Sequence, residues 1–399
     1  MSEYSDRVIS VGGEKILPVA AIYGANASGK SNVYRAFECM RRYVIRSFSY
    51  GGDDNTVDRA FRPVPFLFSS ETEKADTSFE VFFTLPGDRS ERVYQYGFSV
   101  GNNEIHEEWL YSKAKTGREY TRVFERDVTA IDPLDLKGIP RESRDNIRIS
   151  LEPQVLVVSL GAKLKVEKCK LVRDWFLSTL CTDFADSQMN YRTLPPGFTE
   201  DSSVQADVAR FLSSFDESIQ GFRVEKIPSD SAGSEYYKVV SIHKRDGSDG
   251  WMELPLADES AGTLKMFSLY PLLQAVLRGG GVFFVDELNA RLHPLLVRNV
   301  ILTFLNPETN PMHAQLIFTT HDTWQLSTHL LRRDEIWFTE KGEDEVSSLY
   351  SLADFADEDG VKIRKDESYE KNYLLGKYGA IPALKTIDLL KGGEGFVER

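Results

Sequence analysis

The stretch AIYGANASGKSNV, residues 21 to 33, decides the fold class of this chain. Within it, residues 24 to 31 fit the pattern G-x-x-x-x-G-K-[ST], which is informative only between a strand and a helix. Residues 16 to 23 form a mostly apolar run that is typical of a buried parallel strand. From Val33 to Val44, apolar residues recur at the spacing of one helix face. The sequence therefore predicts a strand, a glycine-rich loop and a helix, in that order.

The predicted loop has the chemistry of a site for a nucleoside triphosphate. Gly24 and Gly29 would let the backbone curl so that its N–H groups surround phosphate oxygens at the positive end of a helix. Lys30 is expected against the β- and γ-phosphates of ATP, and the Ser31 hydroxyl is expected on Mg²⁺. A glycine-rich turn before an ordinary helix is the alternative interpretation. The residues predicted to bind ATP in this loop are Gly24, Ala25, Asn26, Ala27, Ser28, Gly29, Lys30, Ser31 and Asn32.

Length and composition indicate a globular chain with more than one lobe. The 399 residues exceed the usual size of one compact core, and 41% of them are apolar and 27% charged. No segment approaches the roughly 18 uninterrupted apolar residues of a membrane span. The N-terminus, MSEYSDRVIS, lacks an export signal, and the three cysteines have no metal-ligand spacing. These features predict a protein of the reducing cytoplasm that does not contact the membrane.

The charge balance argues against non-specific DNA binding. The net charge is −13, from 61 acidic and 48 basic side chains, whereas contacts to phosphates dominate affinity for nucleic acids. The strongest basic segment is KLKVEKCKLVR, residues 163 to 173. We interpret it as the solvated face of a helix, with a local DNA-binding patch as the alternative.

The remaining sequence alternates between two kinds of pattern. Residues 79 to 126 alternate apolar and polar side chains between turns, which predicts an antiparallel meander. Residues 165 to 220 are expected to be helical, and strands are expected at 222–227, 236–244 and 251–256, the last two joined across Asp246 to Gly250. From Glu259 to about residue 340, helix and strand alternate again. The predicted domains are 1–50 and 259–345 as the two parts of an ATPase core, 51–160 as an antiparallel β subdomain, 161–258 as a helical and β insertion lobe, and 346–399 as a C-terminal extension.

An acidic pair follows a second apolar strand. In GGGVFFVDELNARLHP, residues 279 to 294, the strand from Val282 to Val285 leads into Asp286 and Glu287. At the carboxyl end of a strand beside the loop, Asp286 can hold hydrated Mg²⁺. Glu287 can orient and deprotonate an attacking water, which is the task of a general base. Without the loop, the same pair would be interpreted as the start of a helix.

A histidine ends the next predicted strand. His321 closes the segment AQLIFTTH, and from there it could contact a γ-phosphate and sense its presence. A lone histidine at a strand end is more often structural, but this one follows the acidic pair on the next strand. Glu287 and His321 are therefore the predicted catalytic residues.

A second anion site is predicted at Ser260 and Gly262. They lie at the start of a long helix, where a hydroxyl and free N–H groups attract an anion. An N-cap without further function is the alternative. One chain has no need of two phosphate-facing helix ends this far apart, unless the second end serves the nucleotide of another molecule.

This combination resembles the ABC-type ATPase heads, in which two subunits enclose two nucleotides. The resemblance assigns residues 24–31 to Walker A, 260–262 to the signature, 282–287 to Walker B, 288–294 to the D-loop and His321 to the switch histidine. Within that family, the chain looks most like the bacterial overcoming-lysogenization-defect and abortive-infection ATPases of the RloA, AbiL or PARIS type. The likeness covers nearly the whole chain, in the segments YGANASGKSN, ESAGT, VDELNARLHP, IFTTHD, LRRDEIWF and YLLGKYGAIP.

The resemblance implies both a fold and a function. The implied fold class is α/β, an ABC-ATPase-like P-loop core with an antiparallel β subdomain and a helical insertion carrying the signature region. The implied protein is an ATPase that forms homo-oligomers from head-to-tail dimers and regulates a separately encoded toxic effector, with a phage-derived trigger. The effector is expected to be a nuclease, for instance of the Toprim type, because only 78 residues (399 − 321) follow His321. That length is too short for a fused Toprim domain.

Several features depart from the pattern of the family. The signature is S-A-G instead of the longer form found in transporters, which argues against a transport motor. Gln95 lies within a strand pattern and receives no metal role, so the Q-loop is not assigned. No heptad arms separate the lobes. The alternative function is a DNA-repair or chromosome-structure ATPase that binds DNA directly, and a scaffold that binds ATP with negligible turnover is a third interpretation.

Overall fold

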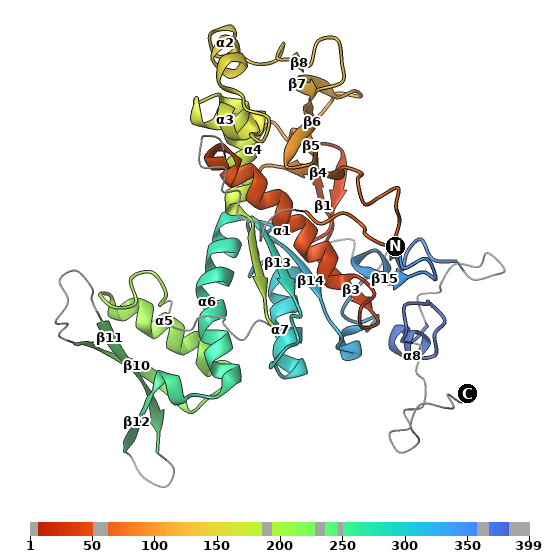
Figure 1. The fold of residues 1–399 in the computed structure, drawn as a ribbon. Helices are drawn as coiled ribbons and strands as arrows, with labels where there is room; N and C mark the ends of the chain where they lie inside the picture. The colour runs from red at the N-terminus through yellow and green to blue at the C-terminus, as the bar shows by residue number, and fades with distance from the viewer. Residues whose placement is uncertain are drawn as a thin grey trace, which may run out of the picture.

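The computed structural model describes residues 7–50, 63–185, 194–227, 236–245, 250–356 and 367–382. Its centre is a six-stranded sheet in the order β16-β15-β3-β14-β13-β9 (Figure 1). Only β16 is antiparallel to its neighbour, and the other strands are parallel. The bounds are β3 Val19–Gly24, β9 Leu180–Asp183, β13 Val282–Asp286, β14 Gln315–Thr319, β15 Ile336–Lys341 and β16 Ser347–Ser351. The predicted α/β class is confirmed by this mostly parallel core sheet.

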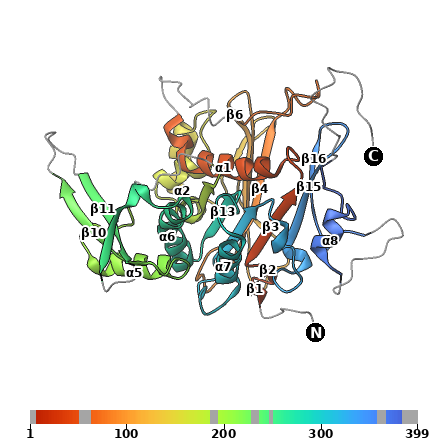
Figure 2. The ribbon, with the colours of Figure 1, turned by 90° about the horizontal axis from the view of Figure 1, so that it is seen from below.

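Helices cover both faces of this core sheet. Figure 2 shows α1 (Lys30–Arg46) on one side of the strands and α7 (Pro294–Leu305) on the other. Alternate residues of each strand serve the two faces: Ile22 and Phe284 pack with Tyr34 of α1, whereas Ala21 and Phe283 join the core under α7 and α6 (Ala261–Gly279). Strands buried on both faces explain the continuous apolar runs in the sequence.

The first predicted strand begins later than expected. The apolar run from residue 16 is divided at Pro18, whose nitrogen carries no hydrogen for a sheet ladder. Residues before the proline belong to β2 (Glu14–Ile16), which pairs with β1 (Ile9–Val11) in a separate hairpin. Pro18 still contributes its carbonyl, which accepts a 2.8 Å bond from the backbone N–H of Leu316.

An antiparallel sheet forms a second layer, and the predicted meander is confirmed. Its order is β4-β5-β6-β7-β8, and three helices pack beside it together with α1. The bounds are β4 Thr77–Thr84, β5 Val93–Gly101, β6 Glu104–Lys113, β7 Thr121–Asp127, β8 Leu134–Asp135, α2 Arg141–Ser150, α3 Val157–Lys163 and α4 Glu167–Ser178. On α4, Lys168 and Lys170 are exposed whereas Cys169 is buried, as expected for a solvated helix face.

The expectation of continuous helix over residues 165 to 220 is wrong in its middle. After α4 ends at Ser178, the four residues of β9 join the edge of the core sheet beside β13. A strand this short has too few residues to show a period of two, and its pairing with β13 decides its conformation. The second helix of the stretch is α5 (Ser202–Ser213).

A three-stranded antiparallel sheet projects from the core next to α5 and α6 (Figure 1). Its strands are β10 (Ile219–Ile227), β11 (Tyr236–Lys244) and β12 (Trp251–Pro255), which confirms the predicted strands. Of the predicted turn across Asp246 to Gly250, residues 246–249 lie outside the described residues. A short 3-10 helix, η4 (Leu256–Asp258), then leads into α6.

The C-terminal part of the described chain packs against the core sheet. Helix α8 (Tyr369–Leu374) brings Tyr373 into a stacked contact with Phe338 of β15, with ring centroids 5.3 Å apart. The remaining 3-10 helices are η2 Ser47–Tyr50, η5 Thr323–Gln325 and η6 Arg333–Glu335. In the ranges given above, none of the helices has the length and apolar character to cross a membrane. The division into five domains stays a prediction.

A buried carboxyl group joins the antiparallel sheet to the helices beside it. Glu108 of β6 is fully buried, and its oxygens accept bonds from the backbone N–H groups of Val157 (2.5 Å) and Val158 (3.0 Å) at the start of α3. Burial raises the pKa of Glu108 from its ordinary value of 4.5 to about 7, although the two N–H groups and Arg126 oppose this shift. The folded protein therefore binds this proton more tightly than the unfolded chain does.

This proton gives a test of the fold. Because the folded-state pKa is raised, the stabilising contribution is fully present below pH 4.5 and is lost as the pH rises through about 7. Glu108→Gln removes the ionisation and keeps an acceptor. The difference in thermal midpoint between variant and wild type should therefore grow in favour of the variant from pH 5 to pH 8. Thermal unfolding at several pH values measures it, and a difference independent of pH would contradict the assignment.

Candidate nucleotide site

The loop between β3 and α1 has a backbone conformation suited to an anion. Gly29 is the residue before the helix, and its φ of 111° lies in the region that favours glycine. A Cβ on Gly24 would collide with the side chains of Ser28 and Thr339. Ala27 adopts a positive φ of 62°, which is uncommon for a residue other than glycine. Among the first N–H groups of α1, those of Asn32 and Val33 donate to the carbonyl oxygen of Gly29 at 2.9 and 3.3 Å. The N–H groups that precede them in a helix have no acceptor one turn earlier, and such groups can bind phosphate oxygens.

Lys30 is buried at the mouth of this loop. Its Nζ donates to the carbonyl oxygens of Gly24 (2.9 Å) and Ala25 (3.0 Å), and the side chain is almost inaccessible. Burial lowers the pKa of Lys30, whereas the nearby carboxylates of Glu287 and Asp286 raise it. The cation is thus held by neutral carbonyls within the field of two acids. A triphosphate fits this arrangement, because its oxygens would be further acceptors for the ammonium group of Lys30.

Ser28 connects the loop to the neighbouring strand. Its Oγ lies 2.6 Å from Thr339 Oγ1, which in turn donates to the carbonyl of Tyr23 at 3.3 Å. Its hydroxyl therefore points to β15, and its N–H lies 3.3 Å from the carbonyl oxygen of Ala25. The bond to Thr339 fixes the shape of the loop.

The acidic pair lies on the strand next but one to the loop. Thr319 of β14 connects the two acids, since its Oγ1 donates to Asp286 (2.5 Å) and accepts from the backbone N–H of Glu287 (2.8 Å). Thr319 was not predicted from the sequence. It could have been inferred from the two threonines before His321, because a strand that pairs in parallel with β13 places them beside the two acids.

Glu287 contacts the predicted switch histidine directly. The distance from its Oε1 to His321 Nε2 is 3.0 Å. The hydrogen bond from His321 lowers the pKa of Glu287, partial burial opposes this, and the charges of His321 and Lys30 lower it further. Glu287 also has a positive φ of 55°, a conformation that costs roughly 1 to 3 kcal/mol and is concentrated at functional sites. The carboxylate is thus ionised and oriented, as a proton acceptor must be.

Residues 288–294, the predicted D-loop, connect the segment around His321 to helix α6. Asn289 Oδ1 accepts from Thr320 Oγ1 (2.8 Å) and from the backbone N–H of His321 (3.3 Å). On the other side, Lys265 of α6 donates to the carbonyl oxygens of Ala290 (2.8 Å) and Phe184. Burial lowers the pKa of this buried lysine to about 8. Lys265 was missed because a single lysine within an apolar helix pattern gives no signal of its own.

Ser260 and Gly262 lie apart from the loop of their own chain. Ser260 is the N-cap of α6, where its Oγ accepts from the N–H of Thr263 at 3.1 Å, and it is exposed. A Cβ on Gly262 would lie 3.6 Å from the carbonyl oxygen of Arg291 in the D-loop. Within the described ranges, no hydrogen bond or ion pair connects these two residues to residues 24–32. The structure therefore assembles Lys30, Asp286, Glu287 and His321 at the carboxyl ends of the core strands and places Ser260 and Gly262 apart from them, with Ser260 Oγ bonded to Thr263.

Gln95 lies away from the predicted metal site, whereas Asp183 lies beside it. Gln95, which received no metal role, bonds to Glu80 at 2.8 Å within the antiparallel sheet. Asp183 ends β9 in register with Asp286 and was missed together with that strand. Within the described ranges, no cluster of three metal-ligating side chains occurs. The assignment of Mg²⁺ to Ser31 and Asp286 stays a prediction; protein sites for this ion usually include phosphate oxygens and waters beside one or two protein ligands.

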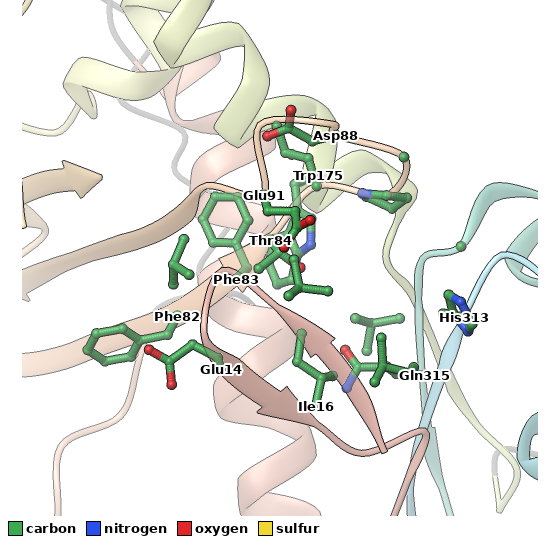
Figure 3. A pocket seen from close by; sticks show the side chains of 18 of the residues that line it. Glu14, Ile16, Phe82, Phe83, Thr84, Asp88, Glu91, Trp175, His313 and Gln315 are labelled. Carbon is green, nitrogen blue, oxygen red and sulfur yellow. The ribbon is translucent and has the colours of Figure 1, made fainter. Parts of the chain in front are cut away.

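A separate cavity lies at the opposite ends of the same strands (Figure 3). It has a volume of about 720 Å³ and reaches Val282 and Gln315, the first residues of β13 and β14. Two of its carboxylates are paired with lysines, Glu14 with Lys113 and Glu91 with Lys115, both at 2.5 Å, and a third, Asp88, bonds to Ser90. An acidic lining without a phosphate loop does not fit a triphosphate, so we place the nucleotide at the loop.

Comparisons with known proteins agree with a P-loop core. Residues 19–323 match the AAA_21 family model, described as "AAA domain, putative AbiEii toxin, Type IV TA system". The head of an SMC protein bound to the C-winged helix domain of ScpA is 14% identical, with a TM-score of 0.37, over 86% of this chain and 94% of that chain. The SMC head domain from Thermotoga maritima is 15% identical, with a TM-score of 0.32, over 85% and 92%. No curated protein matches. Since the family model spans well over half of the sequence, the chain belongs to the AAA_21 family of P-loop ATPase domains.

Proposed function

We propose that this protein is a Mg²⁺-dependent ATPase switch of a bacterial abortive-infection system, and that it regulates a separately encoded effector. The observation that carries the enzymatic part is the 3.0 Å contact between Glu287 and His321, at the sheet edge that also holds Lys30 and Asp286. A carboxylate kept ionised beside a cationic phosphate loop is arranged to accept a proton from water near a γ-phosphate.

Each residue of the site has a distinct proposed role. Lys30 neutralises charge on the β- and γ-phosphates, and Ser31 with Asp286 holds the metal ion. Glu287 accepts the proton of the attacking water, and His321 orients Glu287 and contacts the γ-phosphate. Thr319 and Asn289 keep the acids, the D-loop and the switch segment in fixed relative positions.

We further propose that the functional unit is a head-to-tail dimer. Ser260 is exposed and makes no contact with the loop of its own chain in the described ranges, so its hydroxyl and the start of α6 are available to a second nucleotide. In a dimer, the Ser260–Gly262 end of one subunit would face the loop of the other. Two composite sites would then form.

The biological role rests on the family and on the chemistry that is present. The matched family model names a toxin of a type IV toxin–antitoxin system, which supports a place in cellular defence. The residues described here supply a nucleotide switch, so the destructive step is assigned to a separate nuclease, with a phage product as the trigger. A DNA-binding ATPase is the alternative, and it predicts DNA affinity that falls steeply with salt despite the net charge of −13.

Mixing two inactive variants tests the composite site. Lys30→Ala removes the cation of the phosphate loop, and Ser260→Arg blocks the signature segment, residues 260–262. Each homodimer should be inactive, because both of its composite sites carry the same defect. In the mixed dimer both defects fall on the same composite site, because the signature of one subunit faces the loop of the other. The second site keeps an intact loop and an intact signature. Steady-state ATP turnover of the mixture should therefore recover to a fraction of the wild-type rate.

Two results would count against this proposal. Full turnover by Ser260→Arg alone would remove the signature role and leave a P-loop ATPase that works within one chain. An absence of rescue, with mixed dimers demonstrated by sedimentation, would mean that no independent composite site exists.

A further inference from the structure

A buried polar cluster links the three-stranded sheet to the residue before Ser260. We propose that this cluster positions Ser260 for the nucleotide of a neighbouring subunit, with His243 and Glu259 as the positioning residues. The proposal rests on the composite site described above and adds the means by which the signature serine is held in place.

The centre of the cluster is a contact between a histidine and a glutamate whose side chains are both buried. His243 Nε2 lies 2.7 Å from Glu259 Oε1, and their side chains are only 10% and 5% exposed. Glu259 directly precedes Ser260, the N-cap of α6. Because the residue with the buried carboxylate is directly bonded to the residue with the exposed hydroxyl, a shift of the Glu259 backbone also shifts Ser260.

Serine hydroxyls tie this pair to neighbouring segments. Ser241 Oγ lies within hydrogen-bonding distance of two acceptors, Glu259 Oε1 and the carbonyl oxygen of Leu254 in β12 (3.1 Å), and can donate to one of them at a time. Ser218 Oγ lies 3.0 Å from His243 Nδ1 and donates to Asp216 at 2.6 Å, just before β10. The two ring nitrogens of His243 thus face Ser218 on one side and Glu259 on the other. All three strands thus contribute to the position of Glu259.

The cluster is separate from the phosphate loop. Figure 1 shows α6 between the three-stranded sheet and the core sheet. In the described part of the chain, no hydrogen bond or ion pair links residues 216–259 to residues 24–32. A change in the cluster should therefore alter what Ser260 does for another subunit while the chain still binds its own nucleotide. This separation distinguishes a positioning role from a general loss of structure.

The test uses His243→Gln and Glu259→Gln, with Glu253→Gln as the matched control. Glu253 forms an exposed ion pair with Arg223 at 2.5 Å in the same sheet. We expect both cluster variants to bind ATP at the wild-type affinity and to lose turnover by about tenfold to a hundredfold, which is the effect of misplacing an active-site group. The control should keep wild-type turnover, because exposed pairs contribute little.

Mixing experiments provide a readout that a merely structural role would not give. Each cluster variant has an intact loop and a displaced signature, so it should regain partial turnover with Lys30→Ala and none with Ser260→Arg. Rescue by Ser260→Arg, or wild-type turnover of both variants, would overturn the proposal. If Lys30→Ala and Ser260→Arg fail to rescue each other, the composite site itself is wrong, which is a distinguishable result.

A milder variant covers the case in which the glutamine variants do not fold. Ser218→Ala removes the 3.0 Å contact to His243 Nδ1, together with the exposed bond to Asp216, and leaves the contact between His243 and Glu259 in place. Turnover should fall by about two- to tenfold at unchanged ATP affinity, as expected for one hydrogen bond. A folded Ser218→Ala protein with lowered ATP affinity would contradict the assignment.

Discussion

ATP binding is expected to be lost when Lys30 is replaced by alanine. The Lys30 ammonium is buried and donates to two carbonyl oxygens of the loop, so we expect this cation to bind the phosphate oxygens of ATP. Removing one partner of a buried charged pair costs about 3 to 5 kcal/mol. This corresponds to at least roughly a hundredfold weaker affinity. Titration with a fluorescent ATP analogue measures the affinity directly.

The control for this variant lies on the same helix. Arg35 is exposed on α1, so Arg35→Ala changes one positive charge of the helix without changing the loop. ATP affinity should be at the wild-type level in the control. Unchanged affinity in Lys30→Ala, with the protein folded, would show that the nucleotide binds elsewhere and would remove the basis of the proposed function.

Glu287→Gln should stop hydrolysis while nucleotide stays bound. Glutamine has nearly the shape of glutamate and can still bond to His321, but it does not accept a proton from water. Loss of a general base lowers the rate on the order of 10²- to 10⁴-fold. Because the phosphate loop is intact, the variant should hold Mg²⁺·ATP and accumulate as the closed dimer. Turnover and sedimentation with ATP should be measured on the same samples.

An exposed glutamate after α7 provides the comparison for this variant. Glu308→Gln removes an equal charge from the surface and should leave turnover unchanged. A Glu287→Gln protein that hydrolyses ATP at the wild-type rate would assign the base to another residue, and His321 is the next candidate. A monomer that holds ATP without dimerising would support the catalytic role and contradict the closed assembly.

Contiguous motifs explain what the sequence could predict. The glycine-rich loop and the acidic pair each follow an apolar strand within a few residues, so local pattern and chemistry give the same answer. The meander from Phe79 onward could be predicted because its strands alternate over many residues. His321 was identified for the same reason, as a polar residue at the end of a buried strand.

Residues whose role depends on pairing over long distances were missed. The four residues of β9 have no recognisable period, and their place follows from pairing with β13 about a hundred positions later. Thr319 is important only because β14 lies beside β13, and Lys265 only because α6 packs on the D-loop. The contact between His243 and Glu259 could not be predicted for the same reason, since the two residues are sixteen positions apart.

The threonine between the acids has a consequence for how such a switch can be altered. A single Oγ of Thr319 holds both the side chain of Asp286 and the backbone of Glu287, and His321 lies two positions further along the same chain. In the proposed mechanism, metal binding, proton transfer and contact with the γ-phosphate would therefore all depend on the position of this one hydroxyl. A displacement of β14 after the loss of the γ-phosphate would move both acids at the same moment. A substitution that removes the Thr319 hydroxyl should therefore impair the three proposed roles together instead of one at a time.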